Sequence, residues 1–224
     1  MTDKNLTEIV AIIDRSGSMM LLTKETIGGF NSFLDEQKKT TGKAKLTLVQ
    51  FDDQYQIDQD GVDINDAKPL DETTYIPGGY TSLCDAVGKT IITVGERLSK
   101  TPEEERPGQV IFLVITDGAE NSSKEYTADK IAKMVKHQTE NYSWTFTFLG
   151  GGDAKFQKAQ GAALGFNSSN TYNYSASSGG TERLYGNLSR GISRKREDCV
   201  KGVSVNCDAA LLTLEEQKEI TEDK

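Results

Sequence analysis

The sequence predicts an α/β fold of three layers: a doubly wound, Rossmann-like open sheet, mostly parallel, with helices on both faces. Apolar segments of strand length alternate with amphipathic helical segments along most of the chain, and this alternation is typical of a parallel sheet covered by helices. Two strand segments, EIVAIID at 8–14 and VIFLVIT at 110–116, are almost wholly apolar. Strands of that kind are buried on both faces, so helices should cover both sides of the sheet.

The first half of the chain predicts two parallel strands and one return strand. A polar turn follows the strand at 8–14 and leads into a helix at about 22–39. The next strand, KLTLVQF at 45–51, ends at the acidic pair Asp52 and Asp53. A short strand at 55–58 follows this tight turn. We expect it to pair antiparallel with its neighbour at a sheet edge.

The second half repeats the alternation after a glycine-rich loop, IPGGYTS at 76–82. Its helices are recognised by apolar residues at helical spacing and its strands by short apolar runs. The predicted elements are, in order, a helix at 83–98, the strand at 110–116, a helix at 127–137, a strand at 143–149, a helix at 153–164, a strand at 170–174 and a helix at 180–196.

These elements divide the chain into one domain at 1–196 and a tail at 197–224. The tail has little core-forming pattern and ends in an acidic stretch, so we expect it to be polar and either partly flexible or packed on the domain. The basic run of Arg194, Lys195 and Arg196 falls at the end of the last helix. We interpret it as a solvated helix end that the helix dipole stabilises.

Composition narrows the classes of function. The chain has 224 residues and a formal net charge of −8, which argues against nucleic acid or an anionic membrane surface as a main partner. No apolar run approaches the roughly 20 residues that cross a bilayer, and the first residues lack the pattern of a signal peptide. Three cysteines, an odd number, do not suggest a disulfide framework. We therefore expect a cytoplasmic protein with free thiols.

Hydroxyl and carboxylate side chains follow two of the predicted strands. Asp14, Ser16 and Ser18 lie at the carboxyl end of the first strand, Asp117 follows the 110–116 strand, and Thr81 lies in the glycine-rich loop. In a doubly wound sheet these two strands are neighbours about 4.8 Å apart, and ligands bind at the carboxyl ends of the strands. All five are hard oxygen donors, which suit Mg²⁺, with Mn²⁺ or Ca²⁺ as other possible ions.

The charge of this ligand set indicates what else the ion would bind. Two carboxylates neutralise a doubly charged cation, whereas three hydroxyls add no charge. If one Asp binds only through water, the ion keeps excess positive character. Such an ion favours an anionic ligand, and the Asp or Glu carboxylate of a partner protein would supply one.

At these residues the sequence resembles the von Willebrand factor A (vWA) family. The pattern of that family's metal-ion-dependent adhesion site is D-x-S-x-S, then a distant Thr, then a distant Asp, and it is matched by Asp14, Ser16, Ser18, Thr81 and Asp117. The resemblance covers about residues 8–196. It implies that both serines, and Asp14 directly or through water, hold the ion. It also implies that Thr81 and Asp117 exchange roles when a partner binds, and that movement of the Thr81 loop shifts the last helix, 181–196.

The predicted function is a metal-dependent protein-interaction module without catalytic residues. Two alternatives remain open. One is a Mg²⁺-dependent hydrolase that uses Glu120 or Asp52 as a base. The other is a regulatory component of a bacterial stress-response system, similar to tellurite-resistance proteins, or of a phage system, since small members of the family have such origins. Glu120 is more simply interpreted as a solvated loop acid, Asp52 as a turn residue, and Cys84 as a buried, inert thiol.

Overall fold

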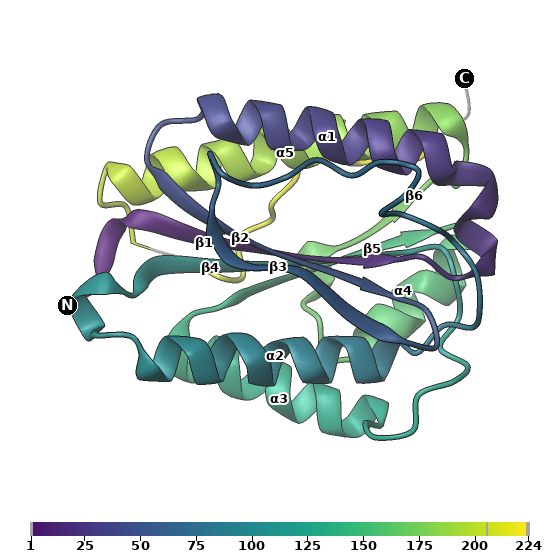
Figure 1. The fold of residues 1–224 in the computed structure, drawn as a ribbon, viewed down its shortest axis with the longest axis horizontal. Helices are drawn as coiled ribbons and strands as arrows, with labels where there is room; N and C mark the ends of the chain where they lie inside the picture. Colours follow the sequence, from purple (N-terminus) through teal and green to yellow (C-terminus); the bar gives the residue numbers. More distant parts are fainter. Residues whose placement is uncertain (1, 205, 223–224) are drawn as a thin grey trace.

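The computed structural model describes residues 2–204 and 206–222, and it has the predicted three layers (Figure 1). A six-stranded sheet in the order β3-β2-β1-β4-β5-β6 lies between two layers of helices. The strands are β1 (Asp3–Asp14), β2 (Lys43–Phe51), β3 (Tyr55–Asp63), β4 (Pro107–Thr116), β5 (Thr145–Gly151) and β6 (Thr171–Tyr174). The helices are α1 (Thr23–Lys39), α2 (Leu83–Lys100), α3 (Ala128–Tyr142), α4 (Ala154–Ala163), α5 (Ser178–Val200) and α6 (Leu214–Glu219).

The strand pairing confirms the predicted mostly parallel sheet with one antiparallel edge strand. β1 is parallel to both β2 and β4, and β3 pairs antiparallel with β2 at the edge. The return strand is longer than the predicted 55–58, because β3 continues to Asp63 across two register irregularities. Sequence periodicity missed this extension because β3 has no buried residue and carries polar residues on both faces.

Each face of the sheet carries its own apolar core. On one face, alternate residues of β1 and β4 pack with α1 and α5, and on the other face the remaining residues pack with α2 and α3. Buried side chains of the first core include Ile9, Ala11, Ile13, Phe30, Leu113 and Leu188. Those of the second include Val10, Ile12, Val87, Phe112, Ile131 and Trp144. This two-sided burial explains why the sequences of β1 and β4 are almost continuously apolar.

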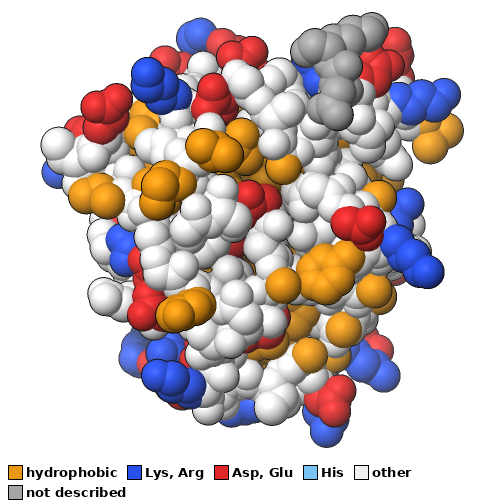
Figure 2. Space-filling view, turned by 90° about the vertical axis from the view of Figure 1, so that its right-hand side faces the viewer, with side chains coloured by type: hydrophobic (Ala, Val, Ile, Leu, Met, Phe, Trp, Pro, Cys, Tyr) orange, Lys and Arg blue, Asp and Glu red, His pale blue; other side chains and the backbone are white. Residues whose placement is uncertain are grey.

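The carboxyl ends of the parallel strands meet at one edge, on the right of Figure 1 and facing the viewer in Figure 2. We call this the carboxyl edge. Helices that start there have well-formed N-caps: Thr127 accepts a bond from Lys130 N–H and Asp153 accepts one from Phe156 N–H. The two helices were predicted to begin at these residues. A 3-10 helix, Gly17–Leu22, joins β1 to α1, so α1 begins at Thr23.

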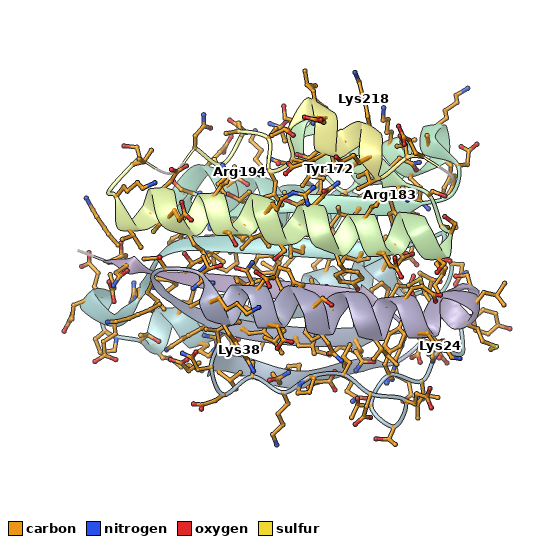
Figure 3. All side chains as sticks on the ribbon, turned by 90° about the horizontal axis from the view of Figure 1, so that it is seen from above. Lys24, Lys38, Tyr172, Arg183, Arg194 and Lys218 are labelled. Atoms are coloured by element: carbon orange, nitrogen blue, oxygen red, sulfur yellow. The ribbon has the colours of Figure 1, made fainter. Side chains whose placement is uncertain are left out.

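The C-terminal segment packs against the domain. α5 extends to Val200, beyond the predicted end at 196, and α6 lies beside it (Figure 3). The guanidinium of Arg194, on α5, forms a 2.7 Å ion pair with Glu216 of α6. Asn170 and Tyr172, next to and in β6, accept bonds from the backbone of Leu211 and Leu212. These contacts hold residues 207–220 against α5 and β6, the opposite sheet edge from β3.

One part of the basic run at the end of α5 is not solvated. Arg196 is 1% exposed, and its guanidinium donates to the carbonyls of Gln37, Thr40 and Gly42 at 2.6–3.1 Å. Those carbonyls lie at the C-terminus of α1, where backbone acceptors lack partners within the helix. The expectation of a solvated helix end was therefore wrong for Arg196, which stabilises the end of a different helix.

The three cysteines are unpaired, as the sequence analysis expects. Cys84, Cys199 and Cys207 are free thiols, and the first two are buried. Burial raises the pKa of Cys84 to about 12, which agrees with the prediction of an inert thiol. Within residues 2–204 and 206–222, no helix has the length and apolarity to cross a membrane. The cytoplasmic location stays a prediction.

Candidate metal centre

The fold brings the five predicted ligand residues to one place on the carboxyl edge. Asp14 is the last residue of β1, and Asp117 directly follows β4, the strand beside it. Ser16 and Ser18 lie on the turn and 3-10 helix after β1, and Thr81 lies just before α2. Adjacent parallel strands with aligned ends are thus the reason that residues 103 positions apart in sequence become neighbours.

Contacts between these side chains confirm that they converge. The Ser18 hydroxyl donates to Asp117 Oδ1 at 2.5 Å, and the hydroxyls of Ser16 and Ser18 are 3.2 Å apart. Ser16 N–H donates to Asp14 Oδ1 at 2.6 Å. Asp14, Ser16 and Ser18 therefore form one cluster with Asp117, with Ser18 exposed and Asp14 fully buried.

Thr81 reaches the same cluster from the glycine-rich loop. A Cβ atom on Gly118 would lie 2.8 Å from the Thr81 hydroxyl and 3.4 Å from Asp14 Oδ2, so both oxygens flank Gly118. The Thr81 backbone is fixed by Asn121, whose side chain accepts from Thr81 N–H at 2.9 Å and whose N–H donates to Thr81 O at 3.0 Å. Hydrogen bonds with Asn121 thus hold the Thr81 backbone in place, and the Thr81 hydroxyl and the Asp14 carboxylate both lie close to Gly118.

The glycines of the 76–82 loop allow it to lie directly against the loop after β1. Gly78 N–H donates to Arg15 O at 2.7 Å and Gly17 N–H donates to Gly79 O at 3.2 Å. Gly79 has a φ of +70°, and a Cβ there would lie 2.3 Å from Asp53 Oδ1. A larger residue at 79 would strain the left-handed backbone and displace the exposed Asp53 carboxylate, so this position of the loop before Thr81 favours glycine.

Asp14 is held in place by two residues that sequence reasoning did not assign to the site. The Thr116 hydroxyl donates to Asp14 Oδ2 at 2.5 Å, and the buried Tyr75 hydroxyl donates to Asp14 O at 2.7 Å. Thr116 lies directly before Asp117 at the end of an otherwise apolar strand, a signal that could have identified it. Tyr75 lies on an irregular segment, and its sequence context gives no such signal.

Burial dominates the electrostatics of the two carboxyl groups. It raises the pKa of Asp14 from 3.8 to about 6, although hydrogen bonds from Thr116 and Ser16 counteract the effect. Burial also raises the pKa of Asp117. A buried carboxylate is costly unless a cation or donors compensate it. The two carboxylates whose charge is destabilised by burial lie beside three hydroxyls, and this set of oxygen donors suits a hard divalent cation.

Other acidic residues at this edge are engaged in structural contacts. The Glu120 carboxylate accepts bonds from the N–H groups of Cys84, Ser122 and Ser123 at 2.7–3.1 Å. It is half-buried, so the expectation of a solvated loop acid was wrong. Asp52 forms an ion pair with Arg15 at 3.1 Å and accepts from Gln54 N–H, as expected of a turn residue. Among the described residues, no group of three or more His, Cys, Asp or Glu side chains is placed to hold a metal ion.

We expect metal binding to weaken about tenfold between pH 7 and pH 5. Protons compete with the ion for Asp14, whose pKa is raised to about 6, and one competing proton changes affinity tenfold per pH unit below the pKa. Conversely, the metal-free protein should become more stable as pH falls from 6 to 4, because the folded state binds the proton more tightly than the unfolded chain. Calorimetric titration with Mg²⁺ and metal-free thermal unfolding measure the two effects. Constant affinity across this range would contradict the role of Asp14.

Comparison with known proteins agrees with the fold. By sequence, the chain matches no protein-family model and no curated protein. By structure, it is similar to proximal thread matrix protein 1 of the mussel byssus, with a TM-score of 0.54 and 16% identity over 91% of this chain and 48% of that one. It is also similar to a von Willebrand factor type A protein from Catenulispora acidiphila, with a TM-score of 0.50 and 13% identity over 88% and 42% of the two chains.

A third similar structure is manganese-loaded TRAP protein from Plasmodium vivax, with a TM-score of 0.50 and 14% identity over 71% of this chain and 64% of that one. The chain spans about half the length of the first two proteins. With its sheet order, its helical layers and these likenesses, the chain has a vWA-like fold.

Proposed function

We propose that this domain binds a divalent cation, with Mg²⁺ the expected ion, through Asp14, Ser16, Ser18, Thr81 and Asp117, and that the ion docks a carboxylate of a partner protein. The observation that carries the proposal is the convergence of five oxygen donors on one edge, with Asp14 fully buried and its pKa raised to about 6. A carboxylate held in that environment is suited to a cation. The manganese-loaded state of the TRAP protein supports a divalent ion in this fold.

The chemistry of the ligands favours docking over turnover. The ion would supply a positive centre that attracts an anionic oxygen. Of the five proposed ligand residues, only Ser18 and Asp117 are accessible at the surface where a partner would approach. A hydrolase would need a base, and Glu120 and Asp52 were the two candidates. Both carboxylates are already engaged, Glu120 by backbone N–H donors and Asp52 by Arg15. These contacts support a binding role.

Affinity capture with the immobilised domain tests the proposal, using an extract of the source cells in Mg²⁺ and in EDTA. We expect a set of partners that is retained with Mg²⁺ and lost both with EDTA and with Asp14→Ala. The matched control is Asp129→Ala, because Asp129 is an exposed acid in the first turn of α3 at the same edge. Partners retained equally under all conditions would refute metal-dependent docking. Phosphate release from a generic ester that disappears in Asp14→Ala would instead favour a hydrolase.

A further inference from the structure

Large apolar side chains are exposed around the candidate metal centre. Of the eleven exposed large hydrophobic residues in the described part of the chain, five stand on loops or first turns at the carboxyl edge. They are Met20, Leu21, Ile76, Tyr80 and Phe156, and we call them the apolar rim. Their exposed fractions reach 91% for Leu21 and 68% for Tyr80. Single exposed apolar residues are common, whereas a gathering of them around one site indicates an interaction surface.

Four residues of the apolar rim belong to the same two loops as the metal ligands. Met20 and Leu21 follow Ser18 in the 3-10 helix, and Tyr80 directly precedes Thr81. Backbone bonds between these loops, from Gly17 N–H to Gly79 O and from Gly78 N–H to Arg15 O, keep them together. The two loops that carry these apolar residues and the proposed ligands are therefore held against each other.

The fifth residue approaches the centre from α4. Phe156 lies in the first turn of α4, and its neighbour Gln157 donates to Asp117 O at 3.4 Å. Gln160, one turn further, donates to Gly118 O at 3.1 Å. α4 is thus attached to the loop that carries Asp117, on the side away from the glycine-rich loop. Figure 2 shows this edge with hydrophobic side chains in several places and acidic side chains between them.

We propose that the apolar rim contacts apolar side chains on both sides of the docked carboxylate, so that the partner is a protein segment with Asp or Glu between large aliphatic or aromatic residues. This inference rests on the proposed function. Charge complementarity requires an anion at the centre, and a polar segment would leave the surrounding apolar side chains in water. An apolar segment without an acid would leave the cation without its counter-charge. Only a segment that combines both features matches the whole surface.

The direct test is selection of peptides from a displayed random library against the intact domain with Mg²⁺. We expect enriched peptides to contain Asp or Glu flanked by residues such as Leu, Ile or Phe, and to be released by EDTA. Acidic peptides with polar flanking residues would overturn the role of the apolar rim while supporting metal docking. Enrichment without acidic residues or without Mg²⁺ dependence would refute the proposed function itself, and the inference with it.

Variants of the apolar rim provide the second measurement. Leu21→Ser and Tyr80→Ser should each weaken binding of the selected peptide about tenfold or more, because burying a large apolar side chain contributes that much to affinity. The affinity of both variants for Mn²⁺ alone should match that of the wild type. Such a match would show that the variants are folded and that the metal centre is intact. Ile92→Ser is the matched control, since Ile92 is 45% exposed on α2 outside the apolar rim. Equal peptide affinity for all three variants would overturn the inference.

Discussion

Asp14→Asn is expected to weaken Mg²⁺ binding by more than about 100-fold and, in the absence of metal, to raise the thermal stability of the protein at pH 7. The weakening should exceed the roughly 10–100-fold that loss of an outer-shell partner costs, because the ion also loses one of its two proposed carboxylates. The gain in stability arises because Asp14 is fully buried and its pKa is raised to about 6. Keeping this buried carboxylate charged at pH 7 costs roughly 3 kcal/mol, a cost that a neutral amide avoids.

Both halves of this expectation are measurable on the same preparations. Calorimetric titration gives the affinity, and thermal unfolding with EDTA and with Mg²⁺ gives the stability. The wild type should gain stability from Mg²⁺ through preferential binding to the folded state, whereas the variant should not. Asp129→Asn, on the exposed start of α3, should behave like the wild type in both measurements. A variant that binds Mg²⁺ normally would show that Asp14 is a structural turn residue.

Arg196→Met is expected to destabilise the protein by about 3 kcal/mol or more. Arg196 is 1% exposed, and its guanidinium donates to Gln37 O, Gln37 Oε1, Thr40 O and Gly42 O. Methionine has a similar length but no donors, so the carbonyls at the end of α1 would remain buried without partners. Each such group costs roughly 1–3 kcal/mol. Burial lowers the pKa of Arg196 to about 10, so the guanidinium remains charged at neutral pH.

Urea denaturation measures this effect as a lower urea concentration at the unfolding midpoint, with an unchanged dependence of the free energy of unfolding on urea. Arg196→Lys should recover only part of the loss, because an ammonium cannot reproduce the planar fork of donors that contacts α1 and the 40–42 turn. Lys201→Met is the control: the Lys201 side chain is 65% exposed and forms a 3.6 Å ion pair with Glu197, so its replacement should change stability by less than about 0.5 kcal/mol. A loss below 1 kcal/mol for Arg196→Met would mean that water can solvate these carbonyls.

Much of the site could be predicted because its ligands lie next to features that sequence reveals well. Asp14 and Asp117 lie at the ends of strongly apolar strands, and the two glycines before Tyr80 mark an irregular loop before a helix. Position at strand ends then implies proximity. The groups that hold these ligands were less predictable, because Tyr75 and Asn121 lie on irregular segments whose path depends on tertiary packing. The predicted coupling between the Thr81 loop and α5 stays a prediction.

The sequence by itself determined the alternation of strands and helices and the two-sided burial of β1 and β4, and it singled out the five oxygen donors proposed for the ion. Each of these is encoded locally, in periodicity or in a few consecutive residues. Tertiary structure alone decided that Arg196 is buried, that Glu120 fastens a loop to α2, and that residues 207–220 pack on α5 and β6. The local sequence does not reveal whether a charged or polar residue is buried. The partners that the fold places beside it decide whether burial is possible, because a buried polar group needs a hydrogen bond or an opposite charge.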